Sequence, residues 1–526
     1  MRIALFNPTP IDHYSPCIRA LSAYLKQHGH EVRMIFLPCD NYSSRFDPGY
    51  IKQMKQSLVD DMVTKLEGFD LVGMSFLTSM FDVAVQATRA IQKAHPDMKI
   101  AWGGFHPSTM PQQALEFVDM VCVGEGEASF LELVEHLEAG KEPWDIRNWW
   151  FKKPDGDVVS NPHRPLVQDL DTLPYQDFDL QDDWTWDSEN HDKLVKIEWE
   201  TFKHIIPTYP DRNGDLRISY KTMITRGCPH KCSYCGVAFN HDLYKGQRYL
   251  RRRSVEHMIG EIKQIMRRYP EIGIIHFQDD VFFSTSTEEI VKFAEEWKKE
   301  IGMPFRAQCS PATINEEKYA ALIDAGLCFT ELGIQTGSSE TMRMYKRGMT
   351  NEQLLKAVNI ISKYKDYIQV PDYHFILDNP WESTEDVMKG LRLVCTLPPP
   401  YNLLPSSLIF YPGTEFYHKA LEDGFVSDEY KEVYRASFHA PRGNYLNFLF
   451  FLALFNNMPK GVVQMLGSES MVRRFNQKKY DRMWGRLYQA GEKARYVKQF
   501  ASFATKGKLL EITSMRELSR VANQMK

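Results

Sequence analysis

Short apolar runs alternate with amphipathic helical segments along the first 140 residues. Helical spacing of apolar residues is found in segments 17–29 and 83–96; in the first, Ile18, Leu21 and Leu25 share one face. Strands are predicted at residues 2–8, 31–38, 70–77, 98–104 and 120–127. This order predicts an α/β fold with a doubly wound, Rossmann-like parallel sheet over residues 1–140. Ligands of such a sheet bind at the carboxyl ends of its strands.

The alternation stops between residues 141 and 215. Residues 149–159 predict a hairpin that turns through Pro154, Asp155 and Gly156. The remainder of this segment is rich in proline and aspartate and shows no sustained period. We therefore expect a linker that contains one hairpin.

Strand–helix alternation resumes over residues 216–425, with about six units. Strands are predicted at 218–225, 274–283, 304–310, 329–338, 369–377 and 406–414. This pattern predicts a full or partial TIM-type parallel barrel with its active residues on loops at the carboxyl ends of the strands. Residues 426–526 lack the alternation and are expected to form a mainly helical C-terminal domain.

The most apolar run lies at residues 448–455, inside the helical region. A helix needs roughly 20 apolar residues to cross a bilayer, so this run predicts a buried helix instead. A surface that contacts an apolar substrate is the alternative. The N-terminus lacks the pattern of a signal peptide. We expect no transmembrane segment.

Composition and charge agree with a globular protein of several domains. The 526 residues are 43% apolar and 25% charged, and the net charge of −4 comes from 64 basic and 68 acidic side chains. No basic stripe is evident, so a nucleic-acid partner is not expected. Nine cysteines, mostly scattered, indicate reduced thiols and a cytoplasmic location.

Three of the cysteines form a cluster directly after the first predicted barrel strand. Cys228, Cys232 and Cys235 have the spacing C-x3-C-x2-C. A structural zinc site normally shows two separated pairs of ligands, and the nearest candidates for a fourth ligand are His230 and His241. Three soft thiolates suit an iron–sulfur cluster in which one iron stays open. A zinc site or a chance cluster is the alternative.

The sequence T-R-G-C-P around Cys228, with Tyr234 before the third cysteine, closely resembles the radical S-adenosylmethionine (radical SAM) enzymes. The resemblance implies that Cys228, Cys232 and Cys235 hold a 4Fe-4S cluster and that S-adenosylmethionine chelates its fourth iron. One electron would then cleave S-adenosylmethionine to a 5′-deoxyadenosyl radical. It also implies sensitivity to oxygen and a reductant such as flavodoxin or ferredoxin.

Other barrel positions resemble the same family. Residues 276–282 resemble its D-D-x-F stretch, which implies that Asp279 and Asp280 lie near the adenosyl group together with Tyr234. Residues 332–338 resemble G-I-E-S-G-S, but Gln335 stands where glutamate is usual, so any contact with S-adenosylmethionine would be neutral. Asp378 likewise replaces a usual glycine. For Asp279 and Asp280, a helix cap or a loop carboxylate is the alternative; for the turn that contains Asp378, a purely structural role is.

The N-terminal domain resembles the cobalamin-binding module that precedes many radical SAM barrels. The similarity lies in SFL (75–77), GG (103–104) and GEGE (124–127), where small residues let a corrin approach the backbone. It implies cobalamin contacts at Ser75, Leu77, Gly103, Gly104, His106, Gly124 and Glu125. A domain that has kept its fold and lost the cofactor is the alternative.

The wider cobalamin family ligates cobalt through D-x-H-x-x-G, which this chain lacks because Asp12 and His13 are adjacent. His13 and His106 are the remaining candidates for a cobalt ligand; a loop or core histidine is the alternative for each.

Together the two resemblances imply a cobalamin-dependent radical SAM methyltransferase that methylates an unactivated carbon or a phosphinate phosphorus. The alternative within this fold is a cyclase or carbon–carbon bond-forming enzyme that acts on a tetrapyrrole or lipid-like substrate without net methylation. A cobalamin or redox sensor is the alternative from another class. The substrate could be a small molecule, a peptide or a lipid-like compound, and no catalytic side chain is assigned.

Overall fold

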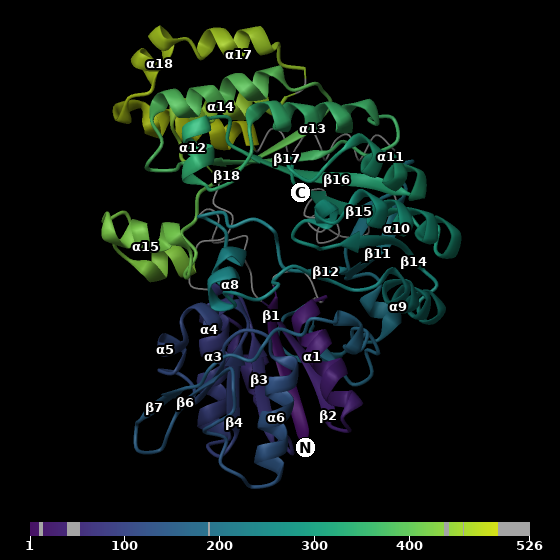
Figure 1. The fold of residues 1–526 in the computed structure, drawn as a ribbon. Helices are drawn as coiled ribbons and strands as arrows, with labels where there is room; N and C mark the ends of the chain where they lie inside the picture. Colours follow the sequence, from purple (N-terminus) through teal and green to yellow (C-terminus); the bar gives the residue numbers. More distant parts are fainter. Residues whose placement is uncertain (10–13, 39–52, 188–189, 436–440, 456, 493–526) are drawn as a thin grey trace.

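The computed structural model describes residues 1–9, 14–38, 53–187, 190–435, 441–455 and 457–492. Two sheets, each flanked by helices, form its two main bodies (Figure 1). The N-terminal sheet lies at the bottom of the view and the barrel sheet at the top. The loops around β12 (Thr225–Arg226) and α8 (Val237–Leu243) lie between them.

Five parallel strands form the centre of the N-terminal sheet, in the order β5-β4-β3-β1-β2. They are β1 (Arg2–Thr9), β2 (Glu31–Pro38), β3 (Leu71–Ser75), β4 (Lys99–Gly103) and β5 (Met120–Cys122). The chain reverses direction across the sheet between β1 and β3, which creates a topological switch point at their carboxyl ends. The predicted doubly wound sheet is confirmed.

Helices cover both faces of this sheet. Helix α1 (Pro16–Gln27) packs against α6 (Glu127–Glu138), and α2 (Gln56–Thr64) packs against α3 (Phe81–Ala94). In α1 the buried positions include Ile18 and Leu25, as the apolar spacing predicts.

The segment that we expected to be a linker contributes strands to both edges of the N-terminal sheet. The expected hairpin is present as β6 (Trp149–Lys152) and β7 (Val158–Ser160), and β6 pairs with β5. At the opposite edge β8 (Trp184–Trp186) pairs with β2, and β9 (Leu194–Lys196) pairs with β8. Each of these pairs is short, which explains why residues 141–215 show no sustained apolar period.

The second sheet is an open, partial barrel of six parallel strands in chain order, with β10 (Thr208–Pro210) antiparallel at one edge. The parallel strands are β11 (Leu216–Thr222), β14 (Ile272–Phe277), β15 (Phe305–Cys309), β16 (Leu327–Gln335), β17 (Asp372–Leu377) and β18 (Asn402–Ser407). The last strand begins four residues before its predicted start. Residues Asn402–Ser407 pair with β17, whereas the sequence predicts the strand at 406–414.

The barrel helices begin where the sequence supplies capping side chains. They are α9 (Val255–Arg268), α10 (Thr287–Glu300), α11 (Glu316–Ala325), α13 (Asn351–Lys363) and α14 (Thr384–Thr396). Their caps each accept a hydrogen bond from a backbone N–H in the first turn and are Ser254, Ser286, Asn315, Thr350 and Ser383.

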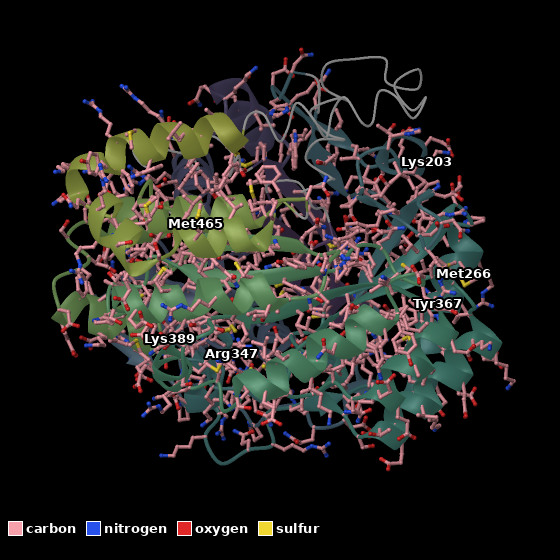
Figure 2. The ribbon with its side chains drawn as sticks, turned by 90° about the horizontal axis from the view of Figure 1, so that it is seen from above. Lys203, Met266, Arg347, Tyr367, Lys389 and Met465 are labelled. Atoms are coloured by element: carbon pink, nitrogen blue, oxygen red, sulfur yellow. The ribbon has the colours of Figure 1, made fainter. Side chains whose placement is uncertain are left out.

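The described C-terminal region is helical, with α15 (Glu415–Glu422), a π-helical turn (Tyr430–Tyr434), α16 (Tyr445–Ala453), α17 (Lys460–Leu466) and α18 (Glu469–Phe475). The apolar run forms most of α16, which packs on α14 with Leu449 and Phe450 fully buried. In Figure 2, Met465 of α17 lies on the opposite side of the molecule from Met266 of α9. No helix among the described residues is both long and apolar enough to span a membrane.

Candidate cofactor-binding site

A cavity of about 420 Å³ lies between the N-terminal sheet and the barrel. One wall is formed by the carboxyl ends of β3, β4 and β5, and the facing wall by the segment that leads into the cysteine loop. The first wall contains Ser75, Gly103, Gly104, Gly124 and Glu125, and the facing wall contains Arg226, Gly227 and Asp280. The cavity therefore joins residues from both predicted cofactor sites.

The cavity continues into the N-terminal domain between the sheet, α1 and α6. Gly73 on β3 is required there, because an added Cβ would lie 2.9 Å from Leu5 Cδ2 and 3.0 Å from Phe130 Cζ. Gly104 has φ +87°, and a Cβ would lie 2.7 Å from the backbone nitrogen of Phe76. Both glycines are explained by close packing on the protein's own atoms. Because neither carries a side chain, the cavity wall at these positions stays bare, which is compatible with a large, flat ligand.

The third region of the cavity wall is polar and comes from the barrel. Glu261 of α9 is buried and accepts hydrogen bonds from Thr222 Oγ1 (2.7 Å) and Arg253 Nη2 (2.6 Å). Arg253 Nε donates in turn to His257 Nδ1 at 2.9 Å. The sequence analysis did not identify these residues, because nothing in their spacing marks them as lining a shared cavity.

The cysteine loop connects β12 with α8 on the facing side. Cys232 is 9% exposed, and Cys228 and Cys235 are half-buried. The backbone N–H of Cys235 donates to the Cys232 carbonyl at 3.0 Å, and His241 Nε2 donates to the Cys228 carbonyl at 2.7 Å. Of the two histidines considered as ligands, His241 thus supports the backbone of the loop.

Burial is the main reason why the pKa of all three thiols is raised, to about 12 for Cys228 and about 11 for Cys235. At these two, backbone hydrogen bonds act against the rise and the nearby carboxylate of Asp280 adds to it. Without a metal the thiols are therefore protonated at neutral pH, and metal binding would release their protons. Among the described residues, no three cysteine, histidine or carboxylate side chains converge as ligands of a single metal ion. The cysteines of an iron–sulfur cluster instead bind separate iron atoms. Three neighbouring free thiols on one half-buried loop fit such a cluster.

The two neighbouring aspartates face different ways. Asp279 is fully buried and accepts hydrogen bonds from the backbone N–H groups of Ile224 (3.1 Å) and Thr225 (2.5 Å) and from the Thr225 hydroxyl (2.5 Å). It anchors the start of the cysteine loop and is absent from the cavity wall. Asp280 lines the cavity and is exposed to it. The surrounding protein walls, which partly desolvate its carboxylate, and then the charge of Asp279 raise its pKa to about 6.

Tyr234 and Gln335 lie on the barrel side of the cysteine loop. Arg347, which is 7% exposed, donates to the Tyr234 hydroxyl at 2.8 Å and to the Gly333 carbonyl at 2.6 Å. A Cβ added to Gly333 would lie 2.8 Å from Gln335 Nε2 and 3.7 Å from Arg347 Nη2. Gln335 therefore lies beside Arg347, which in turn contacts Tyr234. Gln335 ends β16 with φ +66°. Sequence reasoning missed Arg347, a basic residue after a short helix with no recognisable spacing.

Two of the predicted cobalamin contacts lie off the described cavity wall. Leu77 is 52% exposed. His106 is fully buried, stacks on Phe76 and has both ring nitrogens close to polar partners, Thr78 Oγ1 (3.3 Å) and Gln113 Oε1 (3.1 Å). Burial lowers its pKa to about 4. His106 therefore has the position of a core histidine, which is the alternative that the sequence analysis gave for it. His13, the other cobalt candidate, lies outside the described residues.

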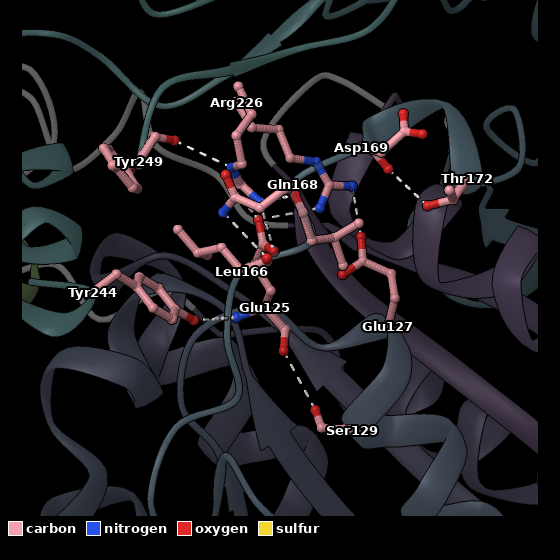
Figure 3. A network of polar contacts seen from close by, with 12 residues as sticks. Glu125, Glu127, Ser129, Leu166, Gln168, Asp169, Thr172, Arg226, Tyr244 and Tyr249 are labelled. Carbon is pink, nitrogen blue, oxygen red and sulfur yellow. Dashed lines mark hydrogen bonds and ion pairs between the residues drawn. The ribbon is translucent and has the colours of Figure 1, made fainter. Parts of the chain in front are cut away.

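Glu125 lines the cavity, but its carboxylate is engaged by arginines of the barrel domain (Figure 3). Its Oε1 lies 2.6 Å from Arg251 Nη2 and 3.4 Å from Arg226 Nη1. The adjacent Glu127 binds Arg226 Nη2 at 2.6 Å. These contacts between residues about a hundred positions apart could not be predicted from the sequence.

Comparisons with known proteins divide the chain in the same way. A B12 binding domain model matches residues 4–134, and a Radical SAM superfamily model matches residues 222–391. An uncharacterized methyltransferase of Pyrococcus horikoshii is 26% identical over 361 residues, or 68% of this chain and 70% of that protein. The anaerobic magnesium-protoporphyrin IX monomethyl ester cyclase of Rubrivivax gelatinosus is 25% identical, and the match covers 71% of this chain and 60% of the cyclase.

A third relative matches along more of the chain. The cytidylyl-2-hydroxyethylphosphonate methyltransferase of Streptomyces wedmorensis is 23% identical over 492 residues, covering 83% of this chain and 84% of that enzyme. Among solved structures, the cobalamin-dependent S-adenosylmethionine radical enzyme OxsB with bound aqua-cobalamin is similar, with a TM-score of 0.60, 18% identity, and coverage of 100% of this chain and 70% of OxsB. This similarity establishes a shared fold. The chain therefore carries a B12-binding domain over residues 4–134 ahead of a radical SAM domain over residues 222–391.

Proposed function

We propose that the protein is a cobalamin-dependent radical SAM methyltransferase. The observation that carries this proposal is the shared cavity, because glycine turns of the B12-binding domain face Asp280 and the lead-in to the cysteine loop across it. When bound, the cluster would supply the electron that cleaves S-adenosylmethionine, and cobalamin would carry the methyl group.

The chain's own residues would divide the work of binding. Cys228, Cys232 and Cys235 would hold the cluster, and Asp280 would face S-adenosylmethionine from the cavity wall. Ser75, Gly103, Gly104 and Gly124 would receive the corrin where the backbone is bare, and the slot beside Gly73 would receive its nucleotide tail. Tyr234, Gln335 and Asp279 would support the cluster loop from behind.

The finer points of the proposal follow from the chemistry of such a site. An open iron reacts with oxygen, so the enzyme would work in the reducing cytoplasm with a reductant such as flavodoxin or ferredoxin. Its substrate would be a small molecule, a peptide or a lipid-like compound. The domain limits that we propose are 1–140 for cobalamin, 216–425 for the barrel and 426–526 for the C-terminal domain.

The proposal is tested by anaerobic reconstitution with iron, sulfide and hydroxocobalamin, followed by metal counting. About one cobalt and about four irons per chain are expected, the content of one corrin and one tetranuclear cluster. Incubation with S-adenosylmethionine and a strong reductant should then yield 5′-deoxyadenosine, and Cys232→Ala should abolish it. Four irons without cobalt would contradict methyl transfer. They would favour the kind of chemistry for which the Rubrivivax relative, a cyclase, is named. Both cofactors without 5′-deoxyadenosine would favour a sensor.

A further inference from the structure

The cysteine loop is docked onto the B12-binding domain at points on both sides of its three thiols. Before the loop, Arg226 reaches Glu127. Immediately after Cys235, Gly236 packs so closely on Phe105 that a Cβ would collide with the Phe105 ring. Beyond α8, the Tyr244 hydroxyl accepts a hydrogen bond from the Glu125 backbone N–H at 2.9 Å. The turns that we expected to contact cobalamin therefore also hold the cysteine loop.

The strongest of these contacts is a network of two carboxylates and two guanidinium groups (Figure 3). Glu125 binds Arg251 with both oxygens, at 2.6 and 3.0 Å. The Arg251 side chain is 2% exposed and also donates to the Val167 carbonyl at 2.8 Å. A bidentate carboxylate–guanidinium pair fixes orientation as well as distance.

The two arginines lie directly opposite each other in a two-stranded antiparallel ladder. β12 pairs with β13 (Arg251–Arg252), and Arg226 stands opposite Arg251. Like charges at such positions repel, and the repulsion is larger when water is excluded. Among the described residues, these arginines form ion pairs with Glu125 and Glu127 of the B12-binding domain. The ladder that begins the cysteine loop thus depends on charge supplied by the other domain.

The charge state of the network supports this dependence. Burial alone would raise the pKa of Glu127, but the charge and hydrogen bond of Arg226 lower it below its usual value. Glu127 is 8% exposed, so its carboxylate cannot exchange Arg226 for water without opening the contact between the domains.

We infer that Glu127 and Glu125 are positioning residues that hold the cysteine loop through Arg226 and Arg251, so that the B12-binding domain fixes the place of the cluster ligands. The inference rests on the proposed function only where it takes the three cysteines as cluster ligands. Its structural part, the ordering of the loop by the other domain, applies equally to the protein without cofactors.

Hydrogen exchange measured by mass spectrometry tests the inference on the full chain before any reconstitution. In Glu127→Gln, exchange of peptides spanning 226–244 should become at least about tenfold faster, while peptides from β1 and β3 keep their protection. After reconstitution, a chelator should remove iron at least about tenfold faster than from the parent protein, because ligand release follows loop opening. Unchanged loop exchange in Glu127→Gln, within twofold of the parent, overturns the inference.

A matched control separates this network from docking of the domains in general. Asp82 on α3 also forms an ion pair across the molecule, with Arg435 at 3.2 Å. Their side chains are 16% and 15% exposed, between Glu127 (10%) and Arg226 (25%). Asp82→Asn should leave exchange at 226–244 and the rate of iron loss unchanged. If it accelerates both as much as Glu127→Gln does, general loosening is the cause and the inference fails.

Two further variants keep the test decisive should Glu127→Gln fold poorly. Glu127→Asp retains the charge but shortens the reach, so loop exchange should lie between the parent and the glutamine variant. Arg226→Gln combined with Glu127→Gln should be no worse than Arg226→Gln alone, because Arg226→Gln already breaks the pair that Glu127 forms. Additive effects of these two substitutions would show that Glu127 acts elsewhere and would overturn the inference. A protein that never retains iron would count against the proposed function, while the exchange data would still decide the inference.

Discussion

Asp279 at the end of β14 accepts two hydrogen bonds from Thr225, one from its backbone N–H and one from its hydroxyl, each 2.5 Å long. Thr225 precedes Cys228 by three residues. A buried carboxylate two residues beyond β14 therefore positions the start of the cysteine loop, which follows the neighbouring strand β11. Asp280, one residue later, points into the cavity instead.

Asp279→Asn should weaken the loop, because a neutral amide oxygen is a weaker acceptor for the two Thr225 donors that converge on Oδ1, and an NH2 group would replace Oδ2 opposite the Ile224 N–H. Hydrogen bonds to charged groups contribute about 1.5–3 kcal/mol each, so a loss of about 2 kcal/mol in the free energy of unfolding is expected. Iron content per chain after reconstitution should fall as well. The control is Asp280→Asn, which should keep its iron and bind S-adenosylmethionine more weakly. Equal iron content in the two variants would contradict the anchoring role of Asp279.

The corrin site can be blocked without straining the backbone. Gly126 lines the cavity, has no positive φ, and an added Cβ there would meet no atom within 4 Å. Gly126→Leu should therefore fold, fill the cavity and reduce bound cobalt by at least about tenfold while iron stays unchanged; tenfold corresponds to about 1.4 kcal/mol of binding free energy. Gly461 on α17 is similarly free of neighbours and far from the cavity wall, so Gly461→Leu is the control. Full cobalt content in Gly126→Leu would argue against this cavity as the cobalamin site.

The sequence predicts the two α/β bodies well because their strands and helices carry strong apolar periods. It predicts the edge strands poorly, since β8 and β9 are three residues each and depend on pairing for their place, β8 with β2 and β9 with β8. The shift of β18 has the same origin: the apolar Leu408, Ile409 and Phe410 resemble a strand, but the register with β17 ends at Ser407.

The candidate site shows a similar division. Local motifs identify the cysteines and the glycine turns, because their spacing or lack of a side chain is itself the signal. The ionic partners of Glu125 are invisible in the sequence, because Arg226 and Arg251 come near it only when the two bodies pack together. The direction of a side chain also cannot be predicted from the sequence, as the different positions of Asp279 and Asp280 show.

The position of α16 decides between the two interpretations of the apolar run at residues 448–455, a buried helix or a surface that contacts an apolar substrate. Phe450 is fully buried and packs on Phe375, with ring centroids 4.8 Å apart. Phe450→Ala should lower the free energy of unfolding by about 3–5 kcal/mol, the usual cost of removing a buried aromatic ring. Met465→Ala, at a residue that is 64% exposed, should change it by less than about 0.5 kcal/mol. Urea unfolding measures both, and a small effect of Phe450→Ala would refute the core assignment.

His106 should make the protein sensitive to mild acid without serving as a cobalt ligand. Its pKa is lowered by burial to about 4, whereas an unfolded histidine titrates near pH 6.5. Because the folded pKa is the lower one, the unfolded state gains the proton first, and stability that is present above pH 6.5 is lost as the pH falls toward 4. Between pH 7 and pH 5 this single group costs about 2 kcal/mol.

His106→Gln removes that titration, so its free energy of unfolding should fall by about 2 kcal/mol less between pH 7 and pH 5 than that of the parent protein. Gln27→Ala, which changes an exposed residue without a titratable group at the end of α1, serves as the control and should keep the parent's pH dependence. The absorption spectrum of bound cobalamin should be the same in His106→Gln and the parent, because both nitrogens of His106 lie against Thr78 and Gln113 within the core. A spectral change typical of a lost axial ligand would show that His106 leaves the core to reach the cobalt when the cofactor binds.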